Sequence, residues 1–107
     1  MTKPVVKLGQ VFVTDGVQKL MSKDDTIIVN IATGASTTYN TMTLVALLDR
    51  HRMGDWGELD AHDKRVNDDA LSIRGRLLSV YLYNGKRVWI ITDDGWEVTT
   101  VLLPEEY

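Results

Sequence analysis

Cysteine is absent from the 107-residue sequence, and histidine occurs only twice. The missing thiols exclude disulfide bonds, a cysteine nucleophile and zinc or iron–sulfur centres held by cysteine, and two histidines offer little to a soft metal. Long apolar runs are missing as well: nothing approaches the roughly 18 uninterrupted apolar residues of a membrane span, and the first residues lack the apolar stretch of a signal peptide. We therefore expect a cytoplasmic protein without metal, cofactor or membrane contact.

Basic charge is also scarce, since 12 lysines and arginines stand against 15 aspartates and glutamates and give a formal net charge of -3. This balance argues against a surface that follows nucleic-acid phosphates, so we favour a protein partner over nucleic acid. Acidic residues gather in the stretches 55–69 and 93–107. A chain of this length is expected to form one domain, residues 1–107.

Hydrophobic periodicity predicts helices over 41–53 and 60–72. The stripe of the first has i, i+3, i+4, i+7 spacing and consists of Leu44, Leu47, Leu48 and His51. The second starts after the capping residue Asp60, and its stripe consists of Leu59, Val66, Ala70 and Ile73. Upstream, β-branched residues predict strands over 5–13 and 26–31, and the capping-box spacing of Asp15 and Gln18 predicts a short helix between them.

The last third predicts a β-meander. Asn84-Gly85 between two apolar runs is a strong hairpin signal, because a type I′ turn needs positive φ at both central residues. Strands over 77–83 and 87–92 then pair, and a third strand follows over 96–103. The turn at Asp94-Gly95 leaves two registers open, and we favour a two-residue turn because it keeps Glu97 out of the core.

Pairing across the hairpin places two sets of residues on opposite faces. We expect the core face to carry Leu78, Val80, Leu82, Trp89 and Ile91. The other face carries Leu77, Ser79, Tyr81, Tyr83, Val88 and Ile90, whose hydroxyls either meet water or lie under a helix. Together these elements predict an α+β fold, a single domain in which an antiparallel β-meander packs against two or three helices.

Catalytic signals are weak. His51, followed four residues later by Asp55 and further on by Asp63, could supply a general base and an orienting carboxylate for a small hydrolase or nuclease. A packed histidine near a helix end and a turn carboxylate are the more common explanation. Neither a Gly-x-Ser-x-Gly elbow nor a phosphate-binding glycine loop occurs. We therefore expect that the protein is not an enzyme.

Two sets of residues are candidates for binding. The first is an acidic surface around a tryptophan and consists of Asp55, Trp56, Asp60, Asp63 and Asp68. Helix capping and a solvated helix face explain such acids equally well, and their spacing lacks the pattern of a calcium-binding loop. The alternative set, for stacking the bases of single-stranded nucleic acid, consists of Tyr81, Tyr83 and Trp96.

Several stretches resemble a family of small bacterial proteins carried on plasmids, phages and integrated elements. They are Asp49-Arg50-His51, Gly54-Asp55-Trp56-Gly57-Glu58-Leu59-Asp60, Trp89-Ile90-Ile91-Thr92 and Thr99-Thr100-Val101-Leu102-Leu103-Pro104-Glu105-Glu106-Tyr107. The resemblance covers roughly 47–107. Members are labelled plasmid-related protein or type I restriction endonuclease subunit M, but a methyltransferase subunit needs a Rossmann-like domain with a glycine-rich cofactor loop, which this chain lacks.

The resemblance implies an accessory protein of a mobile genetic element. Combined with the clustered acids and the weak catalytic signals, it leads us to expect a protein that is not an enzyme and that binds another protein, such as a host defence or replication protein, through the acidic surface. A small hydrolase or nuclease that uses His51, and a module that binds single-stranded nucleic acid, are the alternatives.

Overall fold

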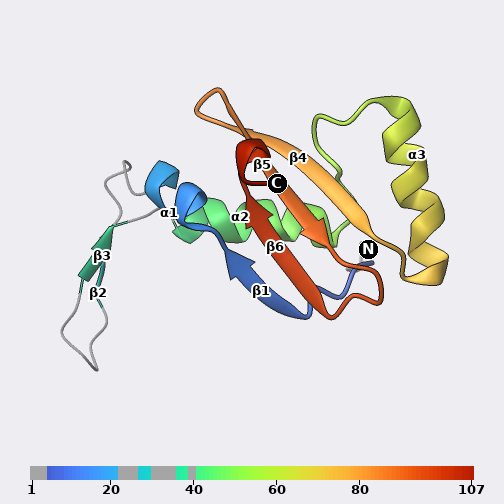
Figure 1. The fold of residues 1–107 in the computed structure, drawn as a ribbon, viewed down its shortest axis with the longest axis horizontal. Coiled ribbons are helices and arrows are strands. Elements are labelled where there is room, and N and C mark those ends of the chain that lie inside the picture. The colour runs from blue at the N-terminus through green and yellow to red at the C-terminus, as the bar shows by residue number, and fades with distance from the viewer. Residues whose placement is uncertain (1–4, 22–26, 30–35, 39–40) are drawn as a thin grey trace.

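The structure is a computed structural model that describes residues 5–21, 27–29, 36–38 and 41–107. In chain order its elements are β1 (Gln10–Val13), α1 (Asp15–Met21), β2 (Ile27–Val29), β3 (Ser36–Thr38), α2 (Thr41–Arg52), α3 (Ala61–Ala70), the 3-10 turn η1 (Leu71–Ile73), β4 (Leu77–Tyr83), β5 (Lys86–Thr92), β6 (Val98–Leu102) and the 3-10 turn η2 (Pro104–Glu106). The main sheet has the order β1-β6-β5-β4 (Figure 1). Strands β4 to β6 form an antiparallel meander, and β1 adds in parallel beside β6. The predicted α+β fold is confirmed.

The two turns of the meander differ in how well they were predicted. Asn84 and Gly85 form the first with φ values of 50° and 78°, the left-handed values of a type I′ turn. In the second, Thr92 pairs with Thr99, and the Trp96 N–H donates to the Asp93 carbonyl at 2.9 Å. The predicted two-residue turn is therefore wrong. The loop is longer by two residues, which preserves the face on which each residue of β6 lies.

The prediction of which face forms the core is wrong, although two of the residues predicted there, Val80 and Ile91, are buried. The buried inner face carries Leu77, Ser79, Tyr81, Tyr83, Val88, Ile90, Thr92, Thr99 and Val101. Helices α1 and α2 cover this face (Figure 1), and Val17, Met21 and Leu47 pack into its core cluster. The tyrosines thus lie under a helix, the second of the two arrangements considered for them.

Helix α3 lies beside the edge of β4 rather than across the sheet (Figure 1). The predicted cap is confirmed, because the Asp60 carboxylate accepts from the Asp63 N–H at 2.8 Å. The predicted stripe is wrong at Val66 and Ile73, which are 51% and 76% exposed, whereas Leu59 and Ala70 pack against a core cluster. The fully buried residue of α3 is polar Asn67, so apolar packing is only part of what attaches α3.

Asn67 and a short backbone segment close the outer edge of β4. The Asn67 side chain donates to the Leu78 carbonyl at 2.7 Å and accepts from the Leu78 N–H at 3.3 Å. Two residues further along β4, the Val80 N–H donates to the Trp56 carbonyl at 3.2 Å, and the Val80 carbonyl accepts from the Glu58 N–H at 2.7 Å. These contacts replace a neighbouring strand and leave fewer backbone groups open to another chain.

The N-terminal predictions were too long or displaced. Residues 5–9 are not strand, so β1 occupies only the end of the predicted range 5–13. The cap of α1 is Thr14 rather than Asp15, since the Thr14 hydroxyl accepts from the Val17 N–H at 3.4 Å. Strand β2 falls within the predicted range 26–31 and pairs only with β3 among the described strands; the rest of that range lies outside the described residues.

Candidate binding surface

His51 lies in the last turn of α2 with no exposed surface. Its Nδ1 is 2.6 Å from the Ser79 hydroxyl, and its Nε2 is 2.8 Å from the Thr92 hydroxyl. Thr92 Oγ1 lies 2.8 Å from Thr99 Oγ1, which in turn donates to the Leu8 carbonyl at 2.6 Å. A buried chain of hydrogen bonds therefore joins α2, three strands of the sheet and the segment that precedes β1.

The hydrogen bond from Thr99 to the Leu8 carbonyl determines which group donates in each of the other hydrogen bonds of this chain. Thr99 gives its only proton to a carbonyl, so it accepts from Thr92, and Thr92 accepts from the Nε2–H of His51. The Ser79 hydroxyl then donates to Nδ1, and every group is satisfied with a neutral imidazole. Burial lowers the pKa of His51 to about 4, which keeps the ring neutral at pH 7. Since a general base must reach its substrate, this geometry favours a structural role for His51.

Asp55 fixes the loop between α2 and α3. Its carboxylate receives two hydrogen bonds from Arg50, at 2.7 and 3.3 Å, and one from the Gly57 N–H at 3.2 Å. The hydrogen bond from Arg50 holds the pKa of Asp55 below its ordinary value. The Arg50 guanidinium also lies 4.5 Å from the centroid of the Tyr81 ring, and the Tyr81 hydroxyl donates to the Asp55 carbonyl at 2.6 Å.

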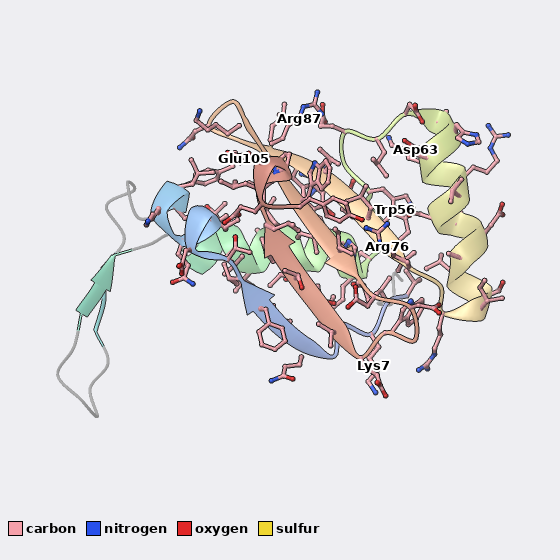
Figure 2. All side chains as sticks on the ribbon, viewed as in Figure 1. Lys7, Trp56, Asp63, Arg76, Arg87 and Glu105 are labelled. Carbon is pink, nitrogen blue, oxygen red and sulfur yellow. The ribbon has the colours of Figure 1, made fainter. Side chains whose placement is uncertain are left out.

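The remaining members of the predicted acidic surface have different roles. Trp56 is 3% exposed, and its indole N–H donates to the Asp68 carboxylate at 2.9 Å. Asp60 caps α3, whereas Asp63 is exposed near the start of that helix (Figure 2). Across the described part of the chain, no hydrogen bond joins His51 to Asp55 or to Asp63. The structure therefore does not assemble the acid–base group considered from the sequence.

The rings considered for base stacking are buried. Tyr81, Tyr83 and Trp96 are 0%, 7% and 5% exposed. The Trp96 indole N–H donates to the Gly75 carbonyl at 2.9 Å, and the Arg74 guanidinium lies 5.4 Å from the centroid of the ring. Stacking requires an accessible ring face, so these residues do not provide a nucleic-acid surface in this conformation.

The opposite side of the sheet, which we call the open face, is less covered than the inner face. It consists of Phe12, Leu78, Val80, Leu82, Arg87, Trp89, Ile91, Val98, Thr100 and Leu102. Of these, Val80, Ile91 and Leu102 are buried, and Leu78, Trp89, Val98 and Thr100 are partly buried. Phe12 and Leu82, on the two outer strands, are 49% and 52% exposed. Figure 1 shows this side, with α2 behind the sheet. Contiguous apolar surface with a polar rim is typical of interaction sites.

The C-terminal residue packs against the open face. Tyr107 is 73% exposed, and its ring contacts Trp89 edge to face with centroids 5.5 Å apart. Arg76 donates to the Tyr107 hydroxyl at 2.8 Å. Glu106 anchors this segment, because its carboxylate accepts from the Thr14 hydroxyl at 2.6 Å. That hydrogen bond also holds the pKa of Glu106 below its ordinary value.

Two hollows flank Arg76, whose position is labelled in Figure 2. The first, about 220 Å³, is lined by Leu59, Asp63, Val66, Asn67, Arg76 and Leu78. The second, about 270 Å³, is lined by Arg76, Ile91, Asp93, Thr100, Leu102 and Tyr107. Each combines apolar side chains with one cation and one carboxylate, a lining that suits side chains of a protein.

Neither the geometry of the described residues nor similarity to known proteins adds another site. Within the described ranges, no group of three or more histidine or acidic side chains is placed to hold a metal ion. None of the described helices is long and apolar enough to cross a membrane. No protein-family profile, curated protein or solved structure matches the chain.

Trp89 was predicted in the core and not at the surface, because the wrong face of the hairpin was assigned to the core, and its contact with Tyr107 was not predicted. A usable signal was present. A histidine in the apolar stripe of a helix needs polar partners on the strand that it faces, and Ser79 lies on the tyrosine side. That pairing would have selected the inner face.

Proposed function

We propose that the protein has no catalytic role and acts by binding another protein through the open face. The observation that carries this proposal is the partly exposed Trp89 on β5, which Tyr107 contacts, on a face whose outer strands carry exposed Leu82 and Phe12. Tryptophan, tyrosine and arginine supply most of the binding energy at protein interfaces. The open face and its rim contain all three types.

Charge supports a protein rather than a nucleic acid as the partner. Asp63 and Asp93 line the two hollows of this side, and Glu105 lies near Arg87 at the far end of β5. Carboxylates at these positions repel phosphates, and the formal net charge of -3 adds no long-range attraction. A protein surface can place complementary charges against both signs.

The wider role follows from the resemblance of residues 47–107 to proteins of mobile elements. On that basis we propose a cytoplasmic accessory protein of such an element, with a component of a host defence system as one target. Of the acidic residues predicted to bind a partner, only Asp63 belongs to the proposed binding surface, because it lines the hollow between α3 and β4. The other acids and Trp56 hold the fold together.

Site-specific photo-cross-linking tests the proposal. We would place p-benzoylphenylalanine at position 89 and, as a matched control, at position 73, where Ile73 is exposed outside the open face. In cells expressing the protein, we expect protein adducts from position 89 and few from position 73. Equal yields at the two positions, or no adduct from position 89, would refute the proposal.

A further inference from the structure

The open-face residues of β5 form a stripe with a charge at each end. Arg87, Trp89 and Ile91 alternate along the strand, and Asp93 follows at the next position on the same side. Asp93 lines a hollow together with Ile91, which places its side chain on this face. At about 3.4 Å per residue, the two charges lie about 20 Å apart. Between them Trp89 is partly exposed, whereas Ile91 is buried.

We propose that the open face binds a second copy of this chain, with the two β5 strands packed face to face and antiparallel. The proposal rests on the proposed function of the open face and names its occupant. A two-fold axis beside Ile90 would set Arg87 of each copy opposite Asp93 of the other, and Trp89 opposite Ile91. Each contact then occurs twice, as a symmetric dimer requires.

The two charges are free to act between copies. In the described part of the chain the ion pairs are Arg50–Asp55 and Arg52–Asp49, and neither Arg87 nor Asp93 takes part in one. Lys86 and Asp94 adjoin the stripe and strengthen its positive and negative ends. Glu105 lines a hollow at the positive end, and Arg76 lines a hollow at the negative end. Each reduces the net charge of its end without reversing the sign.

Charge also selects the direction of packing. A parallel arrangement of the two strands would set Arg87 against Arg87 and Asp93 against Asp93, and such like-charge contacts are strongly unfavourable. Aligned sheets pack about 10 Å apart and about 30° from each other. At about 10 Å from the axis this rotation displaces opposing residues by roughly 5 Å, a distance that a long arginine side chain spans.

The shape of the face agrees with this arrangement. Tyr107 forms an exposed ridge beside Trp89, and a hollow of about 270 Å³ lies next to that ridge, beside Ile91 and Thr100. The two-fold operation that exchanges Trp89 with Ile91 carries the ridge of one copy toward the hollow of the other. Docking would therefore bury the Tyr107 ring, which is 73% exposed in the single chain.

Charge exchange between two variants tests the proposal in the purified full chain. Sedimentation equilibrium would be measured for the wild type, Arg87→Glu, Asp93→Arg and an equimolar mixture of the two variants. We expect a wild-type dimer and, for each variant alone, a dissociation constant raised on the order of a hundredfold. In the mixture, Glu against Arg and Asp against Arg restore both contacts, so a mixed dimer should form. Arg65→Glu, the same charge change on exposed α3, should leave the wild-type dimer intact.

Each outcome has one meaning once urea unfolding shows that the variants fold. A wild type that is monomeric at millimolar concentration, or single variants that dissociate without recovery in the mixture, would overturn the second-copy proposal. The cross-linking experiment separates this failure from that of the proposed function. An adduct with twice the mass of the chain supports both proposals, an adduct with a different protein supports only the function, and no adduct at position 89 defeats both.

Discussion

The two faces of the sheet differ in which polar groups they bury and which apolar groups they expose. The inner face is completely buried at Ser79, Thr92 and Thr99, all of which carry hydroxyls, and α2 adds the imidazole of His51. The open face presents leucine, phenylalanine and tryptophan, with Leu82 and Phe12 about half exposed. Residue type alone therefore does not tell which face is inside.

Hydrogen-bond satisfaction explains the inner face. A buried hydroxyl without a partner costs about 1–3 kcal/mol, but a complete chain of donors and acceptors removes that cost and fixes one register of helix and strands. The open face has no comparable network. Its Val80, Ile91 and Leu102 are buried, but Leu82 and Phe12 remain about half exposed. They retain surface that another molecule can bury.

The largest expected effect comes from breaking the network at its centre. His51→Ala leaves a cavity and removes the partner of both Ser79 and Thr92. We expect the free energy of unfolding to fall by about 3–5 kcal/mol, measured by urea denaturation.

The second histidine is the matched control for this change. His62 is exposed on α3, and His62→Ala should change the free energy of unfolding by less than about 0.5 kcal/mol. If the two substitutions lowered the free energy of unfolding by similar amounts, the buried hydrogen-bond network of the inner face would not be what stabilises it.

The sequence predicted those features that depend on local chemistry. Asn84-Gly85, the Asp60 cap and the helical stripe that ends at His51 all occur as expected, because turn geometry and periodicity decide them. The choice of face depends on partners distant in the sequence, since buried Ser79 finds its hydrogen-bond partner in His51 of α2, 28 residues earlier in the chain. Likewise, nothing in the α3 periodicity indicates that Asn67 completes the edge of β4.

The pH dependence of stability tests the neutral state of His51. Its pKa falls from an ordinary 6.5 to about 4 on folding because burial penalises the charged ring. The unfolded chain then binds more protons between these values, so the stability present above pH 6.5 is lost as the pH falls through this window, by about 3 kcal/mol. In NMR titrations, the His51 ring signals should stay those of a neutral imidazole down to about pH 5. Titration near pH 6.5 would contradict this.

A smaller loss of stability is expected at the outer edge of β4, which Asn67 closes. Asn67→Ala removes both hydrogen bonds to the Leu78 backbone, and the free energy of unfolding should fall by about 2 kcal/mol. Hydrogen exchange should accelerate at the Leu78 amide. The Val80 amide, which donates to the Trp56 carbonyl, is the internal reference and should change less. Equal acceleration at both amides would mean that α3 is attached by something other than Asn67.

The smallest effect on stability is expected on the open face, at Tyr107. Tyr107→Ala removes an exposed ring, and the free energy of unfolding should change by less than about 1 kcal/mol. Acrylamide quenching of tryptophan fluorescence should nevertheless rise, because Trp89 loses the ring that contacts it, whereas Trp56 and Trp96 are 3% and 5% exposed. The measurement should be made in the Arg87→Glu variant, in which self-association does not cover Trp89.

Tyr107→Phe is the matched control, because it keeps the ring and loses only the hydroxyl that Arg76 binds. It should leave quenching unchanged. A rise with both substitutions would show that the hydrogen bond, rather than the ring contact, shields the open face.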